Sequence, residues 1–192
     1  NNLNFNHGRI LYTCLSKYLL DLSTKSPITI FETGTARGFS SVCMAKSLID
    51  MKNNGTIITL DCIGHNQKMY WNCISDLDGK KTRAELLAPW NEELQHILFI
   101  QGWTDITLKR LGIKRINFAF LDAQHTKDAV MEEFLFVSSR QLKGDIIVFD
   151  DVTPKIFNGV CEAIAEIENN FPYNIEKLFL DKMRGYAIAK KY

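Results

Sequence analysis

Short apolar runs rich in β-branched residues alternate along the chain with longer stretches whose apolar residues recur at helical spacing. Apolar runs bounded by polar or glycine residues are typical of buried strands, and spacings of three and four residues are typical of amphipathic helices. We therefore expect strands at residues 27–31, 56–60, 97–101, 116–121, 145–149, 175–180 and 186–190. We expect helices at residues 10–22, 40–51, 104–111, 129–142 and 154–169, and a further helix beginning near Thr82, which has capping-box spacing with Glu85.

This alternation predicts an α/β protein with a Rossmann-like, doubly wound sheet of seven strands. The last two strands are separated only by residues 181–185, so we expect a hairpin and one antiparallel strand near the C-terminus of a mostly parallel sheet. We treat residues 1–192 as a single domain, with an N-terminal helical segment at 1–26 and an irregular insertion at 62–81. Ligands of such sheets lie beyond the carboxyl ends of the strands, so the residues that follow each strand are the candidates for function.

The turn after the first expected strand carries an acidic residue, Glu32, and two glycines, Gly34 and Gly38. Such a turn lets a ligand approach backbone N–H groups at a helix N-terminus. The turn lacks the Gly-Lys-Ser/Thr of a P-loop, and Ala36 and Phe39 occupy positions where a dinucleotide fingerprint requires glycine. A tight structural turn remains an alternative explanation of the G-x-x-x-G spacing.

Polar or small residues also follow the second and third expected strands. Asp61 ends the second strand, near the offset at which an acidic residue binds ribose hydroxyls, and its carboxylate can accept from both hydroxyls at once. An ordinary loop aspartate is the alternative. Gly102, Trp103 and Thr104 follow the third strand, where a small residue and an aromatic ring would border a purine, although Trp103 could equally be half-buried packing.

Three aspartates follow the fourth and fifth expected strands. Asp122 ends one strand, and Asp150 and Asp151 end the next. Three carboxylates at one edge repel each other unless a cation binds, and hard oxygen ligands suit Mg²⁺, Ca²⁺ or Mn²⁺. The alternative is that Asp151 caps the following helix. His125 lies in the loop after Asp122, where an imidazole could take a proton from a hydroxyl; a surface loop histidine is the alternative.

Composition excludes several classes of protein. Hydrophobic residues make up 46% of the 192 residues and charged residues 23%, which is the ordinary globular mixture. A net charge of +1 gives no electrostatic case for a nucleic acid or a membrane as partner. The five cysteines include no C-x-x-C pair, so we expect reduced thiols and a cytoplasmic location. No apolar run is long enough to span a membrane, and the polar stretch 1–9 predicts no signal peptide, although the true N-terminus is left open by the missing Met.

The stretch 31–46, FETGTARGFSSVCMAK, resembles the first motif of class I S-adenosylmethionine-dependent methyltransferases. Together with Asp122 and the pair Asp150-Asp151, it resembles more narrowly the divalent-metal-dependent O-methyltransferases, which include the catechol, caffeoyl-CoA and macrocin- or mycinamicin-type enzymes. The resemblance covers about residues 28–190. It implies S-adenosylmethionine and Mg²⁺ or another divalent cation as cofactors, and a hydroxyl of a sugar, polyol or phenolic natural product as the methyl acceptor.

The resemblance also implies a role for each matching residue. The implied catalytic residues are His125 and Asp122, and the implied metal ligands are Asp122, Asp150 and Asp151. The implied cofactor-binding residues are Glu32, Gly34, Thr35, Gly38, Ser40, Asp61, Gly102, Trp103, Thr104 and Asp122. His125 falls where the catechol-type enzymes have a lysine base and the antibiotic-sugar enzymes a histidine. Asp151 replaces the asparagine of the catechol and caffeoyl-CoA enzymes, which favours the antibiotic-sugar branch and makes a catechol acceptor doubtful.

Two other functions stay open at the level of the sequence. One keeps the fold but changes the chemistry, as in cephalosporin-hydroxylase-like proteins that resemble the same family. The other is a non-catalytic module that binds a nucleoside ligand or a partner. Retention of the acids of both the cofactor site and the metal site argues against a module without turnover. The metal ion, the acceptor, the role of residues 62–81 and assembly as a homo-oligomer are not determined by the sequence.

Overall fold

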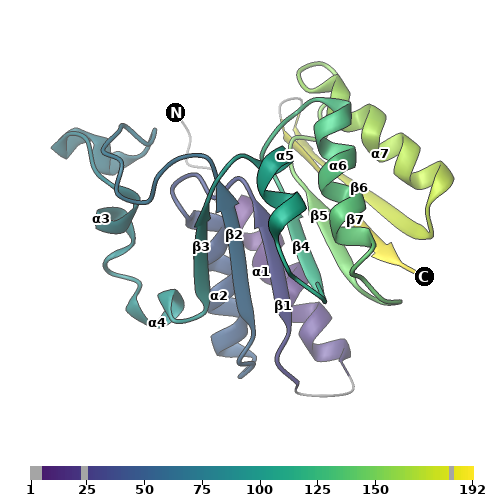
Figure 1. Ribbon diagram of the computed structural model, residues 1–192, viewed down its shortest axis with the longest axis horizontal. Helices are drawn as coiled ribbons and strands as arrows, with labels where there is room; N and C mark the ends of the chain where they lie inside the picture. The colour runs from purple at the N-terminus through teal and green to yellow at the C-terminus, as the bar shows by residue number, and fades with distance from the viewer. Residues whose placement is uncertain (1–5, 23–25, 182–183) are drawn as a thin grey trace. The chain divides into compact units, whose positions relative to one another are not determined.

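A computed structural model describes residues 6–22, 26–181 and 184–192 (Figure 1). Its strands form a seven-stranded sheet in the order β3-β2-β1-β4-β5-β7-β6, which confirms the expected Rossmann-like α/β fold. The chain divides into two compact units. Unit 1 is Asn1–Ile28 with Thr35–Trp103, and unit 2 is Thr29–Gly34 with Thr104–Tyr192.

Unit 1 joins two long helices to a parallel pair of strands. Its elements are α1 (Asn6–Asp21), α2 (Phe39–Asp50), β2 (Thr56–Asp61), η1 (Ile74–Asp78), α3 (Arg83–Leu87), α4 (Asn91–Leu94) and β3 (Ile97–Gln101). The two long helices pack closely because Gly8 of α1 has no side chain: a Cβ there would lie 2.6 Å from Cys43 Sγ and 2.9 Å from the Phe39 ring. The expected N-terminal helical segment is thus described over α1, whereas residues 1–5 and 23–25 lie outside the described residues.

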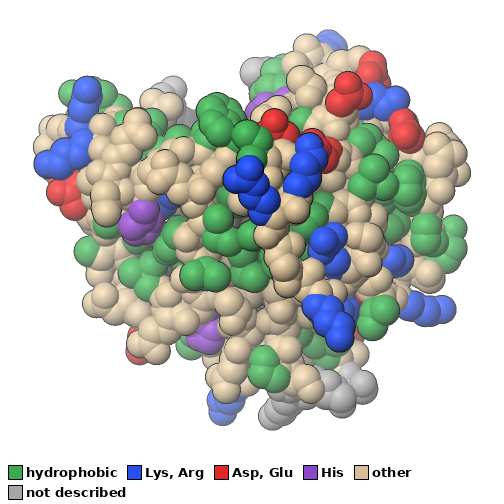
Figure 2. Space-filling view, in the orientation of Figure 1, with side chains coloured by type: hydrophobic (Ala, Val, Ile, Leu, Met, Phe, Trp, Pro, Cys, Tyr) green, Lys and Arg blue, Asp and Glu red, His purple; other side chains and the backbone are tan. Residues whose placement is uncertain are grey.

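The helix α2 lies against β2 through small and apolar side chains. Its buried positions include Ser41, Met44, Ala45 and Leu48, which recur at helical spacing. The edge strand β3 is less covered, and Leu98 in its middle is 52% exposed. Figure 2 shows hydrophobic side chains at the surface over β2 and β3, on the face turned toward the viewer.

Unit 2 holds the remaining strands and the two helices α6 and α7. Its elements are β1 (Thr29–Thr33), α5 (Thr104–Thr107), η2 (Leu108–Arg110), β4 (Phe118–Leu121), α6 (Lys127–Ser138), β5 (Ile146–Phe149), α7 (Asn158–Asn170), β6 (Tyr173–Asp181) and β7 (Arg184–Lys191). The strand β4 pairs in parallel with β1 and β5, and β7 runs antiparallel to β5 and β6. This confirms the one antiparallel strand near the C-terminus; residues 182 and 183 of the expected hairpin connection lie outside the described residues.

Aromatic side chains form much of the core of unit 2. Phe118, Phe120 and Phe149 of β4 and β5 are almost fully buried. On α6, the Phe134 ring packs edge-on against Tyr173, with 5.3 Å between the ring centroids. Burying one such side chain stabilises a fold by about 1.5–3 kcal/mol, so this core fixes the strand ends described below.

Several elements begin or end at residues other than those expected, and the largest difference is at α7. We expected Thr153 to cap a helix beginning at Pro154, but α7 begins at Asn158. The hydroxyl of Thr153 donates to the carbonyl of Asp151 instead of accepting from a following N–H group. The Thr153 carbonyl then accepts from the backbone N–H of Phe157, which closes a single turn before the helix. The expected helix at 104–111 is also divided, into α5 and η2.

The stretch 62–81 is irregular, as expected. An isolated bridge between Met69 and Lys81 closes it, and η1 is its only helical turn among the described residues. The indole N–H of Trp71 donates to the Lys81 carbonyl across this bridge. No helix in the described part of the chain is long and apolar enough to cross a membrane.

Candidate functional site

The carboxylate of Asp61, at the end of β2, organises the site residues of unit 1. Its Oδ2 accepts from the backbone N–H of Ala36 at 2.6 Å and from Arg83 Nη2 at 3.0 Å. Its Oδ1 accepts from the backbone N–H of Ile63 at 2.8 Å. A carboxylate has about four acceptor positions, so roughly one remains for a ligand. About one acceptor position of Asp61 is thus open to a ligand, and the ribose-binding role expected of this residue stays a prediction.

The turn between β1 and α2 holds an unusual backbone. Ala36 has φ +44° and Gly38 has φ +86°, both in the left-handed region. That region costs a non-glycine residue roughly 1–2 kcal/mol. Ala36 is held there from both sides, because its N–H donates to Asp61 and its carbonyl accepts from Arg83 Nε. Ala36 thus adopts a glycine-like conformation at one of the two positions where the dinucleotide fingerprint lacks its glycine.

Two other expected cofactor residues of unit 1 lie near this turn in the chain. The Thr35 hydroxyl is hydrogen-bonded to the hydroxyl of Thr59 in β2 at 2.5 Å, and it is buried. Ser40 is buried in the first turn of α2. These contacts hold the turn against β2, so its shape does not depend on a ligand.

Arg83 is a site residue that sequence reasoning missed. Its side chain is only 3% exposed, and it bonds Asp61, the Ala36 carbonyl and the Ile63 carbonyl. The expected capping box of Thr82 and Glu85 is confirmed: Thr82 is the N-cap, and Arg83 is the first residue of α3. The capping box was the only local signal near Arg83. It predicts where α3 starts, but it does not predict that the Arg83 side chain contacts Asp61.

The residues after β3 are partly exposed. The backbone N–H of Gly102 donates to the Asp61 carbonyl at 2.9 Å, which ties the end of β3 to the end of β2. The Trp103 side chain is 60% exposed, so it is not the half-buried packing residue of the alternative interpretation. Thr104, the first residue of α5, is buried and belongs to unit 2.

In unit 2, the end of β1 approaches the end of β4 very closely. Gly34 has φ +84°, and a Cβ at this position would lie 2.1 Å from the carbonyl oxygen of Asp122. Any other residue would collide with that backbone, so Gly34 is required by packing as well as by conformation. Glu32 is fully buried in β1, opposite Phe120 of β4.

The three expected aspartates lie together at the carboxyl ends of β4 and β5. The parallel register pairs Leu121 with Phe149, so Asp122 and Asp150 follow side by side. Carboxylate oxygens of these two residues lie within 4.8 Å of each other. Oxygens of Asp122 and Asp151 and a ring nitrogen of His125 are likewise all within 4.8 Å of one another.

Asp151 adopts a strained backbone. Its φ is +54°, and its N–H donates to Oδ1 of Asp150 at 2.7 Å. Aspartate is one of the few non-glycine residues that tolerate this region, and such strain gathers at functional sites. The turn directs the Asp151 carboxylate to within 3.0 Å of His125 Nε2. Asp151 is thus a side chain of the cluster, and α7 begins too far along the chain to be capped by it.

His125 is held by a ring and by a close backbone contact, in addition to the acids. Its imidazole stacks on Phe157, with 4.2 Å between the centroids. The start of α7 lies so close that a Cβ on Gly159 would be 2.5 Å from the His125 carbonyl oxygen. The Asp122 side chain, followed by the charges of Asp151 and Asp122, raises the pKa of His125, and partial burial opposes this rise.

Glu133 of α6 is a second residue that the sequence did not single out. It lines the same small cavity as Asp122, His125 and Asp150, and it is 2% exposed. Oε2 accepts from the Thr33 hydroxyl at 2.7 Å, whereas buried Oε1 has no hydrogen-bond partner among the described residues. Burial raises the pKa of Glu133 to about 7. The helical spacing of α6 made this position a core position, and nothing local marked it as acidic chemistry.

The donor set of unit 2 fits a hard divalent cation. Asp122 has an oxygen within 4.8 Å of a carboxylate oxygen of Asp150 and, in a second group, of Asp151 and the His125 ring, so these residues offer oxygen and nitrogen ligands of the kind that Mg²⁺ and Mn²⁺ accept. Such closely spaced negative charges are costly without a cation. The unsatisfied Oε1 of buried Glu133 beside them is a further acceptor for a water molecule or a cation.

Comparisons with known proteins identify the fold and the family. The O-methyltransferase TomG from Streptomyces achromogenes, involved in tomaymycin synthesis and solved in complex with SAM, is 17% identical with a TM-score of 0.71, over 99% of this chain and 81% of that chain. The O-methyltransferase from Bacillus cereus in complex with SAH is 15% identical with a TM-score of 0.70, over 99% of this chain and 83% of that chain.

The sequence comparisons give the family itself. None of the curated proteins matches the chain significantly in sequence. A methyltransferase-domain family matches residues 31–152, which is more than half of the chain and includes the turn after β1, Asp61 and all three clustered aspartates. The chain therefore belongs to this family of methyltransferase domains.

Proposed function

We propose that this chain transfers the methyl group of S-adenosylmethionine to a hydroxyl oxygen of a small molecule, with Mg²⁺ or another divalent cation bound at the three aspartates. The observation that supports this most is the cluster of Asp122, Asp150, Asp151 and His125 at the carboxyl ends of two parallel strands. Membership of a methyltransferase-domain family supports methyl transfer, and the O-methyltransferases of similar fold support oxygen as the acceptor atom. We propose a sugar, polyol or phenolic natural product as acceptor.

The turn after β1 and the ends of β2 and β3 support the cofactor part of this proposal. Gly34 and Gly38 have positive φ, and together they form a tight turn from β1 into the N-terminus of α2, where a ligand can approach the backbone. The remaining acceptor position of Asp61 is assigned to one ribose hydroxyl. Trp103 offers an exposed ring that can stack on adenine.

The aspartate cluster supports the cation part. Asp122, Asp150 and Asp151 would hold the ion, with Asp150 fixed in place by the N–H of Asp151. When bound, S-adenosylmethionine supplies an electrophilic methyl group, and the cation lowers the pKa of the acceptor hydroxyl. The contribution of the chain is then alignment of the acceptor oxygen with the methyl carbon, which the rigid strand ends favour.

His125 is assigned the role of proton acceptor, at Nε2. The Phe157 ring limits rotation of the imidazole and keeps Nε2 toward Asp151, 3.0 Å away. The carboxylates raise its pKa, so the ring holds a proton more readily when their charges are not compensated. Positive charge at the aspartates opposes this rise and favours the neutral imidazole, which can accept a proton near neutral pH.

Methyl transfer from radiolabelled S-adenosylmethionine to a panel of sugars, polyols and phenols tests the proposal. We expect transfer that stops in excess EDTA, returns with added Mg²⁺, and is absent in Asp150→Asn. A matched control is Asp128→Asn, which removes an exposed carboxylate from the first turn of α6 and should transfer normally. Transfer that persists in excess EDTA would exclude the cation role.

A further inference from the structure

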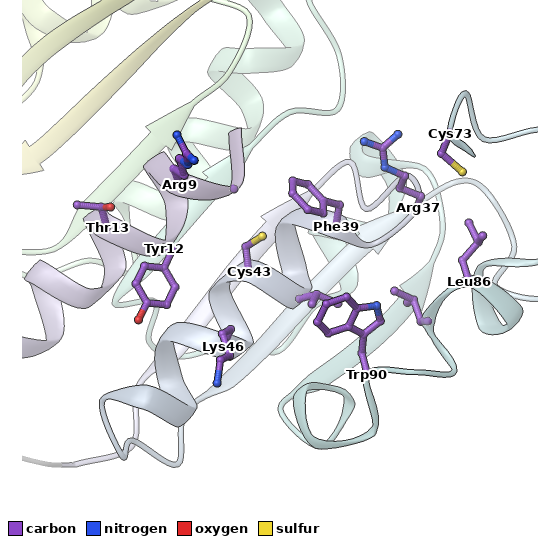
Figure 3. A pocket seen from close by; sticks show the side chains of 13 residues that line it. Arg9, Tyr12, Thr13, Arg37, Phe39, Cys43, Lys46, Cys73, Leu86 and Trp90 are labelled. Atoms are coloured by element: carbon purple, nitrogen blue, oxygen red, sulfur yellow. The ribbon is translucent and has the colours of Figure 1, made fainter. Parts of the chain in front are cut away.

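A second cavity, of about 500 Å³, lies within unit 1 and has no part in the proposed methyl transfer. Its walls come from α1, α2 and α3 (Figure 3). The helix α2 lines it with Phe39, Val42, Cys43 and Lys46, which share a helix face because they are three and four residues apart. The positions Met44, Ala45 and Leu48 are buried on another part of the same helix. Ligand pockets typically measure about 300–1,000 Å³, so the cavity is large enough for a small molecule.

Most of the cavity wall is apolar. Phe39, Leu86, Leu87 and Trp90 contribute large side chains, and the Trp90 ring is 45% exposed. An aromatic ring left open beside aliphatic side chains gains free energy when an apolar group covers it. The wall is also fixed in place: at Gly8 the helices α1 and α2 are already in close contact, so they cannot move together to fill the space. The cavity therefore suits the apolar body of a ligand.

The charges at the cavity are all positive. Arg9, Arg37 and Lys46 line it, and no carboxylate of the described residues does. The Lys46 ammonium is neutralised by Asp50 at 2.8 Å, and the Tyr12 hydroxyl donates to the same carboxylate. Arg9 and Arg37 remain as cationic groups, and Figure 3 shows them on opposite sides of the view, with Phe39 between them and Lys46 and Trp90 below. The Phe39 ring supports the Arg37 guanidinium, 5.7 Å from its centroid.

From this arrangement we propose that the cavity of unit 1 binds a small organic anion with an aromatic or acyl body. The body lies among Phe39, Leu86 and Trp90, and a single acidic head group is bound by Arg37 beside Phe39, while Arg9 adds positive charge from the opposite side of the cavity. Guanidinium groups suit carboxylate, phosphate and sulfonate heads alike, since each presents oxygens to the planar N–H fork. This site is independent of the proposed function, because it uses neither the aspartate cluster nor Asp61.

A fluorescent probe with this chemistry tests the proposal on the intact chain. The probe is 8-anilinonaphthalene-1-sulfonate, and its comparison compound is N-phenyl-1-naphthylamine, which has the same rings without the acidic head. Iodoacetamide labelling with mass spectrometry locates the bound probe, because Cys43 and Cys73 line the cavity. Cys62 is the internal control, since it is exposed and follows Asp61, where a probe in the nucleotide region would protect it.

We expect the sulfonate probe to slow labelling of Cys43 and Cys73 at least threefold and to leave Cys62 unchanged. Arg37→Gln should weaken sulfonate binding by about two- to fivefold, as for an exposed ion pair, and should leave binding of the neutral compound unchanged. The matched control Lys17→Gln, at an exposed position of α1 outside the cavity, should change neither. Protection of Cys62 in place of Cys43, or equal effects of Arg37→Gln on both compounds, would overturn the proposal.

Discussion

His125 and Glu133 lie at the same small cavity, and each holds a proton more tightly than its residue type ordinarily does. The causes differ. The carboxylates of Asp122 and Asp151 stabilise the charged imidazolium of His125, whereas burial favours the neutral form of Glu133. The contribution of Asp122 to His125 comes from three residues away in the chain, whereas that of Asp151 and the burial of Glu133 depend on the folded cluster.

Replacing His125 by alanine tests the proton-acceptor role. Because general-base catalysis is worth about 10²–10⁴ in rate, His125→Ala should lower turnover by about that factor. Affinity for S-adenosylhomocysteine should change little, since the ring is assigned no contact with the cofactor. Steady-state rates at saturating metal and cofactor, with calorimetry for the affinity, check both parts. A turnover number within a few-fold of wild type would make His125 a loop residue without a catalytic role.

Glu133 gives a prediction for stability against pH in the metal-free protein. Its pKa is raised from 4.5 to about 7 on folding, so the native state binds more protons than the unfolded state between these values. The stabilising contribution is therefore present below pH 4.5 and is lost as pH rises toward 7. As pH rises from 4.5 to 8, the free energy of unfolding of Glu133→Gln should increase by about 3 kcal/mol relative to that of wild type.

Urea unfolding in EDTA at the two pH values measures this difference. The matched control is Glu132→Gln, at the preceding position of α6, where the side chain is 39% exposed and pairs with Lys109. An exposed pair of this kind is worth about 0–1 kcal/mol, so the control should stay within that range at both pH values. A free-energy difference between Glu133→Gln and wild type that is the same at both pH values would show that Glu133 does not titrate in this way.

Among the elements, the start of α7 has the most consequence for the site, because it contacts the loop that carries His125. Gly159 allows this contact: an added Cβ would lie 2.5 Å from the His125 carbonyl and 2.8 Å from the Lys127 nitrogen. In a free helix, alanine is favoured over glycine by about 1 kcal/mol. Helix propensity thus predicts that Gly159→Ala stabilises the protein, whereas packing predicts that it destabilises the protein.

We expect packing to dominate, so Gly159→Ala should lower the free energy of unfolding by about 1–3 kcal/mol. It should also lower turnover, since the loop with His125 must move. Gly112→Ala is the control, because nothing lies within 4 Å of a Cβ at that glycine. Urea unfolding and steady-state rates check both variants, and a Gly159→Ala protein more stable than wild type would contradict the packing argument.

The same region shows why the sequence predicts elements better than their ends. Hydrophobic runs located all seven strands, most clearly β1, β4 and β5, because their burial leaves a strong apolar signal. The predicted start of α7 was wrong because the Thr153 hydroxyl donates to the preceding Asp151 carbonyl. This hydrogen bond depends on the strained turn at Asp151. A local pattern such as Thr-Pro cannot reveal that its hydroxyl is already engaged.

At the scale of the whole molecule, topology was predictable and long-range polar contacts were not. The alternation of strands and helices gave the sheet, and it placed Asp122, Asp150 and Asp151 at adjacent strand ends. The partner of Asp61 was missed, since Arg83 reaches it from a short helix beyond the irregular stretch 62–81. Contacts of this kind depend on the path of the intervening loop, and the hydrophobic periodicity of the sequence does not predict that path.

Binding of S-adenosylmethionine underlies the whole proposed function, and calorimetric titration of the wild-type chain measures it without any substitution. Wild type is used because Asp61 also holds Arg83, so substitution at Asp61 would disturb the fold and the binding together. We expect S-adenosylhomocysteine to bind at one site per chain, with and without Mg²⁺, and NAD not to bind. Tight binding of NAD with no heat from S-adenosylhomocysteine would contradict it.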